Sequence, residues 1–258
     1  MNEHGDLNDS KRWWKIGLIV AVAFTLLLSA CSAQTTPQKS TTTEPTTTVT
    51  EVGTAPTAGT VYVDDAGVTS VGAEELKAHL SRMPTSTLTS QQIDDLLWTR
   101  EEEKLGHDVY TALYDKWQLP IFANIAAAEQ THTDAIAQLL ERYSLDDPAA
   151  GEPTGLFTNA DLQKAYDKFL AEGSQSVVAA LTVGATVEEM DIFDLQQRAT
   201  DVPDVALVYA VAQMASRNHL RLFVAELAQR GVTYTPTYIS RDEYNDIISS
   251  PIERDFPG

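Results

Sequence analysis

The chain has 258 residues and carries 37 Asp and Glu against 18 Lys and Arg, a formal net charge of −19. Such an acidic surface repels nucleic acid and anionic lipid headgroups, and it attracts cations. The single cysteine excludes a disulfide framework and a thiolate metal site, so histidine and carboxylate side chains would have to hold any bound metal.

The first 30 residues have the organisation of a secretory signal peptide. A basic segment at residues 11–15 precedes an apolar run over residues 16–28, which is shorter than the roughly 20 residues of a membrane-spanning helix. The run leads into Leu28-Ser29-Ala30-Cys31, which resembles the lipobox of bacterial lipoproteins. We therefore expect residues 1–30 to be removed and Cys31 to be lipidated, which places the protein at the cell membrane, facing outside the cytoplasm. An uncleaved anchor helix is the alternative, and it predicts the same location.

Two segments separate this leader from the main domain. Residues 31–60 are rich in Thr and Pro and have few large apolar side chains, which is typical of a disordered linker. Residues 61–88 form a transitional segment in which a short helix is expected around residues 74–82. Residues 89–250 are numerous enough for one domain with its own core.

The first half of this domain predicts two long helices joined by a short turn. Thr89 and Gln92 have the spacing of a capping box, and apolar residues then recur at steps of three and four as far as Trp117. Pro120 suits the first turn of a second helix, which continues to about Tyr143.

The second half predicts another pair of helices after a long connection. Residues 144–175 form the connection and include a short helix at 159–172, and the third long helix then ends near residue 199. The fourth ends at Gly231, a usual helix stop, and a last short helix begins at Ser240. No strand-type alternation competes with these patterns. We therefore expect an all-α four-helix bundle with a long crossover between the second and third helices, plus short accessory helices.

Six side chains that can ligate metals fall on the inward faces of the four helices, near the middle of each. They are Glu103, Glu129, His132, Glu188, Asp191 and His219. Burying four carboxylates and two imidazoles together is very unfavourable unless a cation neutralises them. Glu129 and His132 stand one helical turn apart, so both can reach the same ion. This pattern predicts a metal site in the bundle.

The segments that carry these residues resemble a known family. They are residues 100–110 (REEEKLGHDVY), 128–132 (AEQTH), 187–192 (VEEMDI) and 216–220 (SRNHL). They resemble the DUF2202 family, within the ferritin-like superfamily of di-metal carboxylate proteins, over about residues 91–248. The resemblance implies that Glu103, rather than Glu101 or Glu102, is the ligand of the first helix, because it stands seven residues before Tyr110. Tyr110 would then orient Glu103.

The sequence departs from the family pattern on the fourth helix. Ser216 occupies the position where an acid usually precedes the ligand histidine by one turn. Asp191 on the third helix can supply the missing carboxylate, with Ser216 beside it. If Asp191 points elsewhere, the site has one bridging carboxylate too few, and binding of a single ion is the alternative. Glu101, Glu102 and Glu189 are expected in solvent or beside the ligands. Asp108 either hydrogen-bonds a ligand histidine or lies at the surface.

The resemblance implies two iron ions, or iron with manganese, and redox chemistry with dioxygen or peroxide, of the peroxidase or ferroxidase type. It assigns no catalytic residue. The rival hypothesis is a non-catalytic metal-binding or surface interaction domain. The expected partners are the membrane, through lipid on Cys31, metal ions and a second copy in a homodimer, with no nucleic acid.

Overall fold

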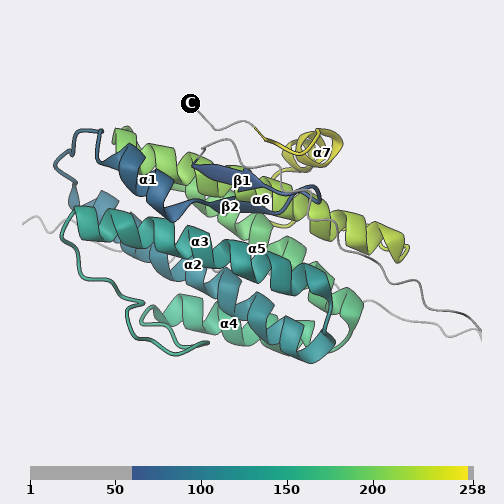
Figure 1. The fold of residues 1–258 in the computed structure, drawn as a ribbon. Helices are drawn as coiled ribbons and strands as arrows, with labels where there is room; N and C mark the ends of the chain where they lie inside the picture. Colours follow the sequence, from purple (N-terminus) through teal and green to yellow (C-terminus); the bar gives the residue numbers. More distant parts are fainter. Residues whose placement is uncertain (1–59, 255–258) are drawn as a thin grey trace, which may run out of the picture. The chain divides into compact units, whose positions relative to one another are not determined.

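The computed structural model describes residues 60–254, which form an all-α fold built on four long helices (Figure 1). The long helices are α2 (Ser90–Trp117), α3 (Pro120–Arg142), α5 (Val177–Gln197) and α6 (Pro203–Gln229). The smaller elements are β1 (Val61–Val63), β2 (Thr69–Val71), α1 (Ala73–Leu80), α4 (Ala160–Gly173) and α7 (Arg241–Ser249). The predicted signal peptide and Cys31 lie outside the described residues. Within residues 60–254, no helix is both long and apolar enough to span a membrane.

The four long helices pack in the arrangement that the connection lengths predict. α2 packs along α3 and α5 packs along α6, and the two pairs meet where α2 contacts α5 and α3 contacts α6. The predicted capping box is present at the start of α2, where the Thr89 hydroxyl accepts the N–H of Gln92 and the Gln92 side chain accepts the N–H of Thr89. Pro120 and Pro203 open α3 and α6. The all-α fold is thus confirmed.

The crossover between α3 and α5 contains α4 and is held against α2 by charged side chains. Arg100 forms an ion pair with Asp147, with Nη2 3.0 Å from Oδ2. Glu101 accepts the N–H of Thr158 at 2.6 Å and its hydroxyl at 2.8 Å, just before α4 begins. Glu101 was expected in solvent or beside the ligands; it is buried and anchors this loop instead.

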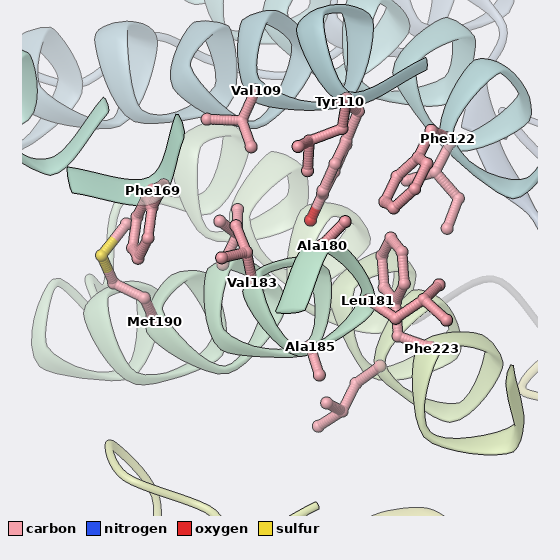
Figure 2. Close-up of a cluster of buried hydrophobic side chains, with 14 of the residues drawn as sticks. Val109, Tyr110, Phe122, Phe169, Ala180, Leu181, Val183, Ala185, Met190 and Phe223 are labelled. Atoms are coloured by element: carbon pink, nitrogen blue, oxygen red, sulfur yellow. The ribbon is translucent and has the colours of Figure 1, made fainter. Parts of the chain in front are cut away.

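Aromatic packing inside the bundle fixes one tyrosine close to α5. The ring centroid of Phe223 lies 5.3 Å from that of Tyr110 and 5.8 Å from that of Phe122. Figure 2 shows the Tyr110 ring reaching from its helix toward the helix that carries Val183. A Cβ at Gly184 would lie 2.4 Å from the Phe223 ring, so only glycine permits this close approach. The Tyr110 hydroxyl oxygen lies 3.2 Å from the Gly184 carbonyl oxygen.

A small antiparallel sheet, absent from the predictions, covers one side of the bundle. β1 and β2 pair in the register Val61 with Val71 and Val63 with Thr69. β2 contacts both α3 and α6, and α1 follows it and packs on α3 (Figure 1). No pattern in the sequence indicated these strands, because each has only three residues, too few to show alternation. The transitional segment is therefore part of the domain.

Candidate metal centre

The structure brings five of the six expected ligands together in two overlapping groups. The first is Glu103, Glu129 and His132, and the second is Glu129, Glu188 and His219. Within each group, one ligand atom from every residue lies within 4.8 Å of the others. All five side chains are buried, with at most 6% of any residue exposed. Each group could hold one metal ion, and Glu129 belongs to both.

Glu129 lies between the two histidines and faces one with each carboxylate oxygen. Its Oε2 is 3.0 Å from Nδ1 of His132, and its Oε1 is 2.9 Å from Nδ1 of His219. Each histidine also has a second carboxylate nearby: Glu103 Oε2 lies 3.7 Å from His132 Nδ1, and Glu188 Oε2 lies 3.7 Å from His219 Nδ1. The centre is therefore two similar halves that share one carboxylate.

Helix geometry explains how four elements build this centre. Glu129 and His132 are three residues apart on α3, so their side chains project from the same face. Glu103 comes from α2, Glu188 from α5 and His219 from α6, each on the stripe that faces the bundle axis. The one-turn spacing on α3 predicted the pairing of Glu129 with His132 correctly.

Asp191 and Ser216 lie beside the two groups and outside them. The Ser216 hydroxyl donates to Oδ2 of Asp191. The Asp191 carboxylate, which comes from α5, therefore lies next to the α6 position at which the family pattern has an acid. Oδ1 of Asp191 and Oε1 of Glu103 are buried and have no hydrogen-bond partner among the described residues. Both residues line a small cavity together with Glu129 and Glu188.

The unpaired carboxylate oxygens test whether these residues fit divalent cations. A buried carboxylate oxygen without a partner is costly, and a cation is the partner that a cluster of carboxylates prefers. Carboxylate and imidazole donors together suit iron, manganese and similar divalent ions. Each of the two ligand groups therefore has donors of the kind that could hold such an ion.

The electrostatics of the centre show an excess of acid. Burial raises the pKa of Glu103 well above its usual range, and the neighbouring Asp191 and Glu129 raise it further. Burial and the charge of Glu129 also raise the pKa of Glu188. Glu129 behaves oppositely: burial would raise its pKa, but His132 and His219 outweigh that effect and hold it well below the usual range. The pKa of His219 rises to about 10, because Glu188 and Glu129 outweigh the effect of its burial.

Tyr110 contacts a different carboxylate from the one expected. Its hydroxyl donates to Oε1 of Glu188 at 2.6 Å, and no hydrogen bond to Glu103 is found in the described structure. The expectation that Tyr110 orients Glu103 was therefore wrong. The reason is the aromatic packing described above, which directs the ring across the bundle toward α5 and away from its own helix. Tyr110 holds the carboxylate of the half-site that contains His219.

Strand β2 supplies contacts to the centre that the sequence did not predict. Thr69 is fully buried, and its backbone contacts the outer ring nitrogen of both ligand histidines. Asn218 donates from its side chain to the Thr69 hydroxyl at 2.9 Å. The only available signal was that Asn218 directly precedes His219; nothing in the sequence connected either residue with Thr69, 149 positions away from Asn218.

Two further acids, Glu102 and Glu189, are buried outside both ligand groups. Glu102 is buried, accepts the indole N–H of Trp98 at 3.0 Å, and lines the cavity. Burial raises its pKa, and the nearby Asp194 raises it further. Glu189 is completely buried and accepts backbone N–H groups of the loop before α7, including that of Ile239 at 2.8 Å. Neither residue is in solvent: Glu102 borders the centre, whereas Glu189 is a structural anchor.

The fold and the site together define an all-α protein with a buried centre of histidine and carboxylate side chains. Residues 92–251 match the family model described as "Uncharacterized protein domain (DUF2202)". The chain belongs to the DUF2202 family, as its motifs predict.

A relative with a known structure supports this assignment. The chain is 46% identical over 178 residues to the uncharacterized protein MJ0754 of Methanocaldococcus jannaschii, a match that covers 68% of this chain and 96% of the relative. The crystal structure of that hypothetical protein superposes with a TM-score of 0.65, covering 66% of this chain and 99% of the other. The relative carries no assigned function, so the site itself must carry the functional argument.

Proposed function

We propose that this protein is a ferritin-like dinuclear metal protein that binds two iron ions, or iron and manganese, and oxidises them with peroxide or dioxygen. The observation that supports this most strongly is Glu129, whose two oxygens each face a different histidine at 3.0 and 2.9 Å. A carboxylate so placed is suited to bridge two cations. The antiparallel helix pairs joined by a long crossover are also typical of ferritin-like bundles.

The donor set favours redox-active metals. Carboxylate oxygens and imidazole nitrogens accommodate both the lower and the higher oxidation states of iron and manganese. Two such ions, when bound, supply together the two electrons that convert hydrogen peroxide and two protons into two molecules of water.

The side chains of this protein have separate tasks in such a centre. Glu103 with His132, and Glu188 with His219, would each complete one half. The Tyr110 hydroxyl fixes the Glu188 carboxylate through its 2.6 Å hydrogen bond. Close packing around the centre limits water access, which strengthens the electrostatic attraction between the carboxylates and a cation.

Loading and turnover of the full-length protein test this function. We expect anaerobically loaded and desalted protein to hold about two ferrous ions per chain, one for each ligand group, and to oxidise two ferrous ions for each peroxide consumed. Ferrous ion and peroxide without protein give the background rate. Protein that binds iron but consumes neither peroxide nor dioxygen faster than ferrous ion alone would contradict the redox function and leave a metal-binding module. Protein that is folded yet binds no metal would contradict the metal centre.

We also propose that lipid on Cys31 tethers the domain to a membrane on the outside of the cytoplasm. The basic, apolar and small residues before Cys31 support this. In a lipoprotein-processing bacterial host, Cys31→Ala should move the protein from the membrane fraction to the soluble fraction without changing its metal content. A substituted protein that remains in the membrane fraction would contradict the lipid tether.

A further inference from the structure

The outer ring nitrogens of both ligand histidines contact the same residue of β2, Thr69. The carbonyl oxygen of Thr69 lies 2.9 Å from Nε2 of His132, and the N–H of Thr69 points at Nε2 of His219 over 3.1 Å. The two rings are stacked, with centroids 5.7 Å apart. A single buried residue therefore contacts the outer nitrogen of both rings, while the inner Nδ1 atoms face Glu129.

Thr69 presents a hydrogen-bond acceptor to His132 and a hydrogen-bond donor to His219. A neutral histidine that gives its Nδ1 lone pair to a metal carries its hydrogen on Nε2. For His132, that hydrogen meets the carbonyl oxygen of Thr69, which is the usual outer partner of a ligand histidine. For His219, it would meet the N–H of Thr69, so that two donors face each other. The contrast applies to the metal-bound state, whatever hydrogens the rings carry without metal.

Hydrogen bonds to both helices hold strand β2 over the histidines and oppose a shift that would relieve this opposition. The Thr69 hydroxyl accepts from the Asn218 side chain at 2.9 Å, and the N–H of Val71 donates to the Thr131 hydroxyl at 2.8 Å. Asn218 and Thr131 directly precede the two ligand histidines in the sequence. The same helical segments that carry the ligands therefore hold the strand over them.

We infer that Thr69 makes the two halves of the centre unequal: the half with Glu103, Glu129 and His132 binds the first cation tightly, and the half with Glu188 and His219 binds the second more weakly. This inference rests on the proposed metal centre. Loss of the outer hydrogen bond of a ligand histidine weakens metal binding by roughly 10- to 100-fold. The same factor is expected between the two affinities.

Anaerobic titration of metal-free, full-length protein with Mn²⁺ tests this, with free Mn²⁺ measured by electron paramagnetic resonance. We expect two steps separated by at least roughly tenfold. His219→Ala should keep the tighter step, and His132→Ala should lose it. Two ions bound with one affinity, or an equal weakening of the tighter step in both variants, would overturn the inference alone. Wild-type protein that binds no Mn²⁺ would overturn the metal centre as well.

A substitution at position 69 tests the cause. Thr69→Pro keeps the carbonyl and removes the N–H that opposes the His219 hydrogen, so the separation between the two affinities should become smaller, while His219 still lacks an outer acceptor. Thr69→Ser keeps both backbone groups and the hydroxyl that accepts from Asn218, and it should leave the separation unchanged. Circular dichroism checks that each variant is folded. A folded Thr69→Pro protein with the wild-type separation would overturn the role of Thr69, and the pair of histidine variants decides the order of binding whether or not Thr69→Pro folds.

Discussion

Replacing Glu129 with glutamine should weaken both metal-binding steps at once, each by at least the roughly 10- to 100-fold that loss of an outer partner of a ligand costs. Glu129 is the one ligand that belongs to both halves of the centre, with an oxygen near each histidine. Glutamine has nearly the same shape, but it is neutral and offers one oxygen, because an amide nitrogen is a donor and not a ligand. A substitution in either half alone should spare the other.

The measurement is the Mn²⁺ titration used for the wild type, combined with elemental analysis of the desalted protein. Glu141→Gln is the matched control, because Glu141 lies on the same helix and is exposed. It should bind both ions as the wild type does. A Glu129→Gln protein that still binds two ions with unchanged affinity would show that Glu129 is not the shared ligand.

Replacing Asp108 with alanine should lower the free energy of unfolding by about 2–4 kcal/mol at neutral pH, because the substitution leaves the Lys104 ammonium buried without its carboxylate. Asp108 is 2% exposed. One of its carboxylate oxygens accepts hydrogen bonds from the Lys104 ammonium and, at 2.8 Å, from the N–H of Gly155. The other oxygen lies beside the His107 ring. Asp108 was expected at the surface or beside a ligand histidine, and it is neither. It joins α2 to the crossover instead.

The effect of Asp108 should depend on pH in a defined direction. Burial alone would raise the pKa of Asp108, but the hydrogen bonds from His107, Gly155 and Lys104 outweigh burial and lower it. Because the pKa is lower in the folded than in the unfolded protein, the stabilisation is complete above the ordinary carboxyl pKa of about 3.9 and disappears as the pH falls further. The difference between wild type and Asp108→Ala should therefore shrink below about pH 4.

Urea unfolding at several pH values measures this difference. Asp161→Ala is the control, because Asp161 also pairs with a lysine on its helix, Lys164, but both side chains are 61% exposed. Its loss should stay below about 1 kcal/mol. A difference for Asp108→Ala that is as small as this, or one that grows as the pH falls, would contradict the anchoring role.

The helices and the pairing of two ligands on α3 were accessible from the sequence because their signals are local. A capping box at Thr89, prolines at helix starts and apolar stripes all act within a few residues. The pairing of Glu129 with His132 follows from a single helical turn. The long crossover then determined which helices are neighbours, and so which further acids meet at the centre.

The parts that the sequence did not predict depend on contacts between distant residues. Thr69 reaches the histidines through strands of three residues that carry no recognisable pattern. The partner of Tyr110 depends on how Phe223 packs against Gly184, which directs the hydroxyl to Glu188. Glu101 and Glu189 look like solvent-facing acids in the sequence because the loops that they bind carry no matching positive charge.

A crystal structure of the manganese-loaded protein, with the ions located by anomalous scattering, tests the dinuclear centre most directly. We expect two anomalous peaks on either side of the Glu129 carboxylate, one beside Glu103 and His132 and the other beside Glu188 and His219. A folded protein without peaks among these side chains, or with its ions bound elsewhere, would contradict the account.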